Sequence, residues 1–99
     1  MSSLQQAMAA APTGALAFDD GSRRLTYGEL AAAVRADAHW LREHEVARCA
    51  LLADNGCAWA IADLALFEAG SVNLPLPTFF TVAQTLHALD DAGVDCVLT

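Results

Sequence analysis

Residues 46–77, VARCALLADNGCAWAIADLALFEAGSVNLPLP, decide the fold of this chain. Residues 46–54 are a nearly continuous apolar run of strand length, a pattern typical of strands that are covered on both faces of a parallel sheet. After an Asp-Asn-Gly turn at 54–56, residues 57–70 are apolar almost all round and end in a glycine suited to a left-handed C-cap, which predicts a buried helix. Residues 71–77 predict a short strand that ends at its prolines.

The next segment repeats this alternation of strand and helix. Thr81 and Gln84 have the spacing of a capping box and predict the start of a helix over residues 81–93, and residues 94–99 predict a last strand. The inward face of that helix is expected to carry Val82, Leu86 and Leu89. Strands that alternate with helices in this way indicate right-handed βαβ crossovers and a parallel three-stranded sheet.

A hairpin and a helix are predicted before the βαβαβ segment. The predicted fold class is α/β, with this hairpin and helix followed by the parallel sheet. Residues 15–26 have the pattern of two short strands around a turn rich in Asp, Gly and Ser. Thr26 with Glu29 three positions later predicts a capping box at the start of the helix that follows. The buried face of this helix is expected at Tyr27, Leu30, Val34, Ala38 and Leu41.

We expect the chain to be an incomplete part of a larger domain. Its last predicted strand runs to residue 99, and no helix remains to cover one face of a sheet whose strands have the pattern of burial on both. Hydrophobic residues make up 56% of the chain, which indicates apolar surface meant for a neighbour. Residues 1–13 are expected to form a flexible N-terminus, and residues 14–99 an α/β subdomain fragment.

The charge excludes two classes of partner. The net charge is −7, with five arginines and no lysine, so the cations that nucleic acid requires are missing and an anionic membrane surface would repel the chain. Residues 1–18 lack the positive charges of a signal peptide. Asp63 interrupts the longest apolar stretch well short of the ~20 residues of a membrane span. We therefore expect no transmembrane segment and a cytoplasmic protein.

No metal or nucleophile pattern emerges. His39 and His44 are five apart on a predicted helix and do not share the face that a metal would need. Cys57 lies near a predicted helix N-terminus, but no histidine is placed by sequence to activate it, so a packed, reduced thiol is favoured. Asp63 either points to solvent or pairs with a residue elsewhere in the parent protein. A solvated acidic edge is favoured over a cation site at Asp90, Asp91 and Asp95.

The loop PLPTFFT, residues 75–81, is the best candidate for ligand contact. It follows a predicted parallel strand, and open α/β sheets bind their ligands at the carboxyl ends of such strands. Its adjacent aromatic side chains either cover a helix end or an absent domain, or line a hydrophobic acyl pocket. The candidate substrate-binding residues are Thr78, Phe79 and Phe80. The glycines are scattered and form no phosphate-binding loop.

Four motifs in register carry a resemblance. LTYGEL at 25–30, the strand at 46–54 with its tryptophan-containing helix, AGSVNLPLP at 69–77 and AGVDCVLT at 92–99 resemble the N-terminal region of the acyl-adenylating, AMP-forming enzymes. These comprise acyl-CoA synthetases, adenylation domains and luciferases, and acyl-CoA synthetases are the most similar. One departure is Glu45, where the family usually has a glycine; a non-glycine there must cap the helix differently or adopt a strained left-handed conformation.

The resemblance implies a parent enzyme that joins a carboxylate to ATP, releases pyrophosphate and passes the acyl group to coenzyme A or a carrier thiol. It implies ATP, Mg and coenzyme A as cofactors of that parent. The PLPTFF loop and the apolar character of the chain favour a fatty or other hydrophobic acid as substrate. The family's phosphate loop and catalytic lysine lie beyond the segment matched here, so this chain is expected to hold no cofactor and to be inactive alone, with the remainder of the enzyme as its partner.

Two alternatives remain open. One is a free-standing α/β protein-interaction module that uses its apolar edge and the Phe79 and Phe80 loop. The other is a small nucleotide- or flavin-binding fold, which shares the architecture but requires a phosphate loop. A fragment with an uncovered sheet is expected to self-associate, whereas an interaction module is expected to fold on its partner.

Overall fold

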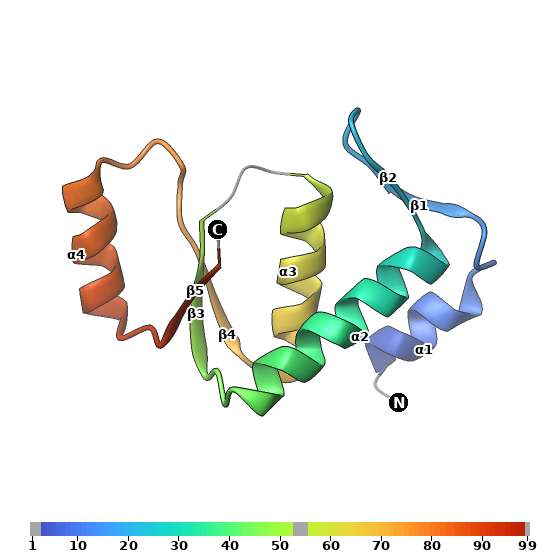
Figure 1. Ribbon diagram of the computed structural model, residues 1–99, viewed down its shortest axis with the longest axis horizontal. Helices are drawn as coiled ribbons and strands as arrows, with labels where there is room; N and C mark the ends of the chain where they lie inside the picture. Colours follow the sequence, from blue (N-terminus) through green and yellow to red (C-terminus); the bar gives the residue numbers. More distant parts are fainter. Residues whose placement is uncertain (1–2, 53–55, 99) are drawn as a thin grey trace.

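A computed structural model describes residues 3–52 and 56–98 of the chain (Figure 1). The predicted turn at 54–56 lies largely outside these residues. In chain order the elements are α1 (Ser3–Ala10), β1 (Leu16–Asp19), β2 (Arg24–Thr26), α2 (Tyr27–Glu43), β3 (Arg48–Leu51), α3 (Cys57–Ala69), β4 (Val72–Pro75), α4 (Val82–Ala92) and β5 (Cys96–Leu98). Within the described part of the chain, no helix is both long enough and apolar enough to cross a membrane.

The predicted parallel three-stranded sheet is confirmed. Its strand order is β4-β3-β5, and β3 pairs in parallel with both neighbours. Cys49 in the central strand is the register partner of Asn73 on one side and of Cys96 on the other. The hairpin of β1 and β2 is a separate antiparallel pair, as the turn chemistry predicted. Helices α2 and α3 lie on one side of the sheet and α4 on the other (Figure 1).

Helix α2 begins at the predicted capping box. The Thr26 hydroxyl accepts the Glu29 N–H at 3.2 Å, and the Glu29 carboxylate accepts the Thr26 N–H at 2.9 Å. These hydrogen bonds to Thr26 lower the pKa of Glu29. The expected inward face of the helix is largely confirmed: Tyr27 is half-buried, and the fully buried residues are Leu30, Val34, Ala38 and Leu41.

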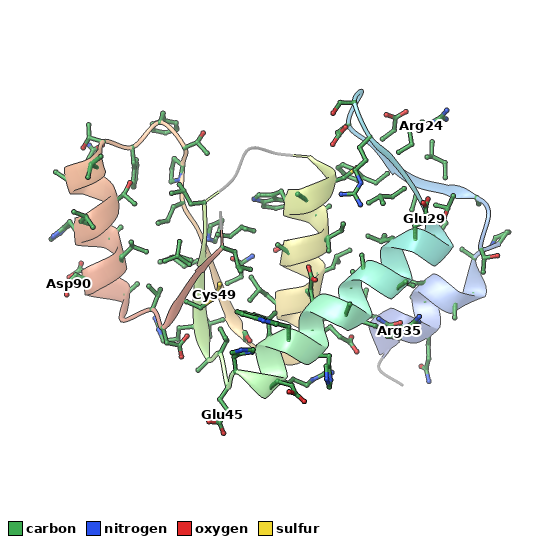
Figure 2. All side chains as sticks on the ribbon, in the orientation of Figure 1. Arg24, Glu29, Arg35, Glu45, Cys49 and Asp90 are labelled. Carbon is green, nitrogen blue, oxygen red and sulfur yellow. The ribbon has the colours of Figure 1, made fainter. Side chains whose placement is uncertain are left out.

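The end of α2 answers the question that Glu45 raised. Glu45 has φ 52°, a left-handed conformation that an L-residue adopts at a cost. Its N–H donates to the Arg42 carbonyl, and the Val46 N–H donates to the Leu41 carbonyl, the two bonds of a Schellman motif. The strained alternative is therefore correct, and the Glu45 side chain points away from the molecule (Figure 2).

The core consists of two clusters that share helix α2. The first joins the hairpin to the start of α3 and contains Met8, Leu25, Leu30, Val34, Cys57 and Ile61. The second lies between the end of α2, the end of α3 and the sheet, and contains Ala38, Leu41, Cys49, Ala65 and Leu66. Helix α3 contributes to both clusters and so connects the hairpin to the sheet.

Helix α1 was not foreseen. It packs on α2, with Met8 only 6% exposed and the Arg35 guanidinium donating to Gln5 Oε1 at 3.4 Å. The sequence indicated only a flexible N-terminus here, because the apolar residues of this short helix find their complement on α2, far along the chain. The division of the chain at residue 13 stays a prediction.

Helix α4 corrects one expectation. It was predicted to bury Val82, Leu86 and Leu89, but none of its residues is buried, and Val82 and Leu86 are 77% and 60% exposed. No other element of the described chain covers that stripe.

The radius of gyration, 14.4 Å, exceeds the about 13 Å of a compact 100-residue domain. The accessible surface of 6023 Å² likewise exceeds the about 5,400 Å² expected for a folded monomer of this mass. The chain is therefore under-packed around α4.

Candidate functional site

A hollow of about 280 Å³ lies at the carboxyl end of the sheet. It lies beyond the end of β3, between the loop that follows β4 and the first turns of α4. Its lining residues are Leu52, Thr78, Phe80, Val82, Thr85 and Leu86. This is the position at which open α/β sheets bind their ligands.

Two local features fix the loop that forms one wall. The Leu76 N–H donates to the Leu51 carbonyl at 2.9 Å, which extends the pairing of β4 with β3 by one residue before the loop begins. At its other end the Thr81 hydroxyl accepts the Gln84 N–H at 3.1 Å, and Gln84 Oε1 accepts the Thr81 N–H at 2.9 Å. This predicted capping box is confirmed, and it sets where α4 begins and hence where Val82 and Leu86 lie.

The structure separates the three predicted site residues. Thr78 and Phe80 line the hollow, whereas Phe79 is 84% exposed and lies outside its lining. The Phe79 ring packs edge-on against the Phe80 ring, with centroids 5.7 Å apart and an interplanar angle of 81°. The two adjacent rings therefore differ in environment, with Phe79 exposed and Phe80 half-buried.

Sequence reasoning missed Leu52 and the contribution of α4 to the hollow. A signal existed for α4, since Val82 and Leu86 share one helix face. That face was assigned to the sheet, and it lines the hollow instead.

Among the residues that the structure describes, the lining of the hollow has no ionisable side chain. Its polar atoms belong to two threonines, and the remaining residues are aliphatic or aromatic. Such a surface binds apolar groups by excluding water from them. This described lining is suited to contact with an apolar ligand.

Asp63 has a partner within the chain. Its Oδ1 accepts a hydrogen bond of 2.6 Å from Asn73 Nδ2, so α3 is joined to β4 through two polar side chains. Neither alternative offered by the sequence, solvent or a residue outside this chain, included this partner. The pair links a helix and an edge strand and lies outside the lining of the hollow.

The thiols are packed, as expected. Burial raises the pKa of Cys57, and the nearby Asp20 carboxylate raises it further. Burial, with a contribution from Cys96, raises the pKa of Cys49 to about 12. All three cysteines are free. Neither buried thiol is ionised at neutral pH, so neither is an activated nucleophile.

The histidines and acids do not gather into a metal site. His39 pairs with Glu43, with Nε2 and Oε1 3.3 Å apart, and His44 stacks on Trp40. Asp95 accepts the N–H groups of Ala47 and Arg48, which lower its pKa. Asp90 extends from α4 away from the sheet (Figure 2). Across residues 3–52 and 56–98, no group of three or more His, Cys, Asp or Glu side chains could hold a metal ion.

Comparison with solved structures gives the same fold repeatedly. O-succinylbenzoate coenzyme A synthetase (MenE) from Bacillus subtilis in complex with AMP is 25% identical, with a TM-score of 0.86 over 100% of this chain and 27% of its own. ATP-bound MatB from Rhodopseudomonas palustris is 24% identical, with a TM-score of 0.80 over 95% of this chain and 20% of its own. The inhibitor-bound N-terminal domain of FACL13 from Mycobacterium tuberculosis is 22% identical, with a TM-score of 0.84 over 95% of this chain and 25% of its own.

The chain thus spans about a quarter of the length of the solved structures that it matches. A search of curated proteins finds no match. The family model described as AMP-binding enzyme matches residues 4–99, which is nearly the whole chain. The fold, its motifs and this match agree, and the chain belongs to the AMP-binding enzyme family.

Proposed function

We propose that this chain is the N-terminal structural portion of an AMP-forming acyl-CoA synthetase. The parent would activate a carboxylate with ATP to an acyl-adenylate, release pyrophosphate, and transfer the acyl group to the thiol of coenzyme A, with Mg as the metal that accompanies ATP. The observation that carries the proposal is the family match over residues 4–99, together with the small share of each relative that the chain covers. We place the parent in the cytoplasm.

The residues of this chain do not suit a nucleoside triphosphate, so no chemical step is assigned to them. The chain has no lysine. The Arg24 guanidinium lies 3.4 Å from Asp19, Arg42 donates to the Glu68 carbonyl at 2.9 Å, and Arg48 Nε donates to the Ala92 carbonyl at 2.8 Å. These cations hold the fold together. The role proposed for the chain is to position the sheet and the PLPTFF loop for the rest of the enzyme.

The size of the native protein tests this role. An antibody against the 99 residues should detect a much larger protein in the source cells, in the soluble fraction after lysis. That protein should catalyse exchange of pyrophosphate into ATP that depends on a carboxylic acid, whereas the 99-residue chain should not. Exchange activity in the short chain, or a native protein of 10.4 kDa, would contradict the proposal.

We also propose that Thr78, Phe79 and Phe80 contact a hydrophobic acyl group. The apolar lining described for the hollow supports this for Thr78 and Phe80, because water-excluding surface favours an alkyl or aryl chain over a polar acid. Phe79 lies outside the lining and is included because its ring packs against Phe80. In the parent, Phe80→Ala should raise KM about tenfold for a long-chain acid and far less for acetate. Phe67→Ala, which removes an aromatic ring that is 71% exposed on α3, is the matched control. Equal losses for long and short acids would argue against contact with the substrate.

A second candidate is a free-standing interaction module. It is favoured by the apolar surface that the PLPTFF loop and α4 expose at Phe79, Val82 and Leu86. Such a module would have a native mass of 10.4 kDa and would bind its partner through this surface. If the chain is a fragment, the same surface should instead make it self-associate, which sedimentation of wild type and Leu86→Asp would reveal.

A further inference from the structure

A groove separate from the hollow lies on the opposite side of the sheet. It has a volume of about 280 Å³ and runs between α2, α3 and β5. The residues that line it are Asp37, Trp40, Leu41, Ala62, Ala65 and Leu98. Its base is closed by Leu41 and Ala65, which are 1% and 0% exposed, and the small side chains of α3 allow another backbone to approach closely.

The rim of this groove combines an aromatic ring with an unpaired carboxylate. Asp37 and Trp40 are three residues apart and so lie on the same face of α2. Trp40 is 45% exposed, unusual for so large an apolar side chain, and its ring is held by stacking on His44 with centroids 4.2 Å apart. Asp37 is exposed and has no ion-pair or hydrogen-bond partner among the side chains that the structure describes.

This combination selects a particular kind of occupant. A carboxylate beside an aromatic ring attracts a guanidinium or ammonium group through an ion pair and a cation–π contact. The apolar base would at the same time accept the aliphatic stem of that side chain and an apolar neighbour. The complementary surface is a polypeptide segment with an Arg or Lys next to an aliphatic residue.

We propose that the groove holds a segment of the parent enzyme that follows residue 99 and presents such a basic side chain to Asp37. The inference rests on the proposed function, under which some three quarters of the parent lies outside this chain. Leu98 of β5, the last residue that the structure describes, lines the groove, so a segment that follows this strand would need little length to reach it. One edge of β5 pairs with β3, and no strand within the described range pairs with the other edge.

Hydroxyl-radical labelling of the native parent tests the inference, with the antibody-determined mass as a separate readout of the proposed function. Trp40 should be labelled several-fold more slowly in the parent than in the 99-residue chain. Asp37→Lys in the parent should restore fast labelling by repelling the basic side chain. Asp90→Lys, the same change at an exposed acid on α4, should leave Trp40 protected.

Each outcome decides between the two proposals. A large parent in which Trp40 is labelled as fast as in the short chain overturns the groove inference and leaves the proposed function standing. Protection that Asp37→Lys does not alter overturns the assignment of a basic partner. A native mass of 10.4 kDa overturns both, since no further segment would then exist.

Discussion

The carboxylate of Asp20, in the hairpin turn, caps helix α3 from 37 residues away: its Oδ2 accepts the Cys57 N–H at 2.9 Å. Its Oδ1 accepts the N–H groups of Ser22 and Arg23 at 2.9 and 2.7 Å. Helix α3 has Gly56 at its N-cap and no side-chain cap from its own segment. An acid at this helix N-terminus is favoured by the helix dipole, and its hydrogen bonds hold the pKa of Asp20 well below its usual range.

Asp20→Asn should therefore destabilise the chain at neutral pH, because an amide can supply only one of the two acceptor oxygens. The folded-state pKa lies below the ordinary value of 3.8, so the stabilisation is complete at neutral pH and is lost as pH falls below about 4. Urea denaturation of wild type and variant at pH 7 and at pH 3 should show a difference that shrinks in acid. Asp90→Asn is the control, and a difference that persists unchanged at pH 3 would contradict this role.

Glu45→Gly should stabilise the chain by about 1 kcal/mol, because glycine adopts the left-handed conformation at φ 52° without the penalty of a Cβ atom. Ala36→Gly, in the interior of α2, should destabilise it by about 1 kcal/mol. Chemical denaturation of both variants measures the free energy of unfolding, which should rise in Glu45→Gly and fall in Ala36→Gly. A loss of stability in Glu45→Gly would mean that its side chain makes a contact worth more than the strain.

Leu66→Ala and Leu86→Ala remove the same atoms from opposite environments. Leu66 is 0% exposed in the second core cluster, and its truncation should cost about 2–5 kcal/mol. Leu86 is 60% exposed, and its truncation should change the free energy of unfolding by less than about 0.5 kcal/mol. Thermal or urea unfolding separates the two. A large loss in Leu86→Ala would show that α4 is covered in solution.

Asp63→Ala and Asn73→Ala should be non-additive. Their hydrogen bond of 2.6 Å joins α3 to β4, so the double mutant should be about 1 kcal/mol more stable than the sum of the single losses implies. A double-mutant cycle by urea denaturation gives this coupling. Strict additivity would place the two side chains apart in solution.

Local signals account for what the sequence predicted correctly. Capping boxes at Thr26 and Thr81 and glycine caps at Gly70 and Gly93 act within a few residues of the chain, so helix limits follow from the sequence. The continuous apolar run before residue 52 likewise determines a strand buried on both sides.

The features that the sequence did not predict depend on partners remote in the chain. The Asp20 cap on Cys57, the Asn73 partner of Asp63 and the surface of α2 that supports α1 all require the tertiary fold. The same holds for the candidate site. Topology predicted a site at the carboxyl end of β4, where the hollow lies, but whether Phe79 or Phe80 faces the hollow is set by the loop backbone, which no residue pattern encodes.

The sheet order β4-β3-β5 also bears on how the protein forms during its synthesis. We expect the central strand β3 to pair first with β4, the nearer partner along the chain, through the crossover helix α3, and later with β5. Asp95, the residue before β5, binds the N–H group of Arg48, 47 residues away. Closing the shorter loop costs less entropy, and N-terminal segments emerge from the ribosome first. The edge of β3 that β5 will occupy is therefore open while translation continues, and a chaperone would have its earliest opportunity to bind there.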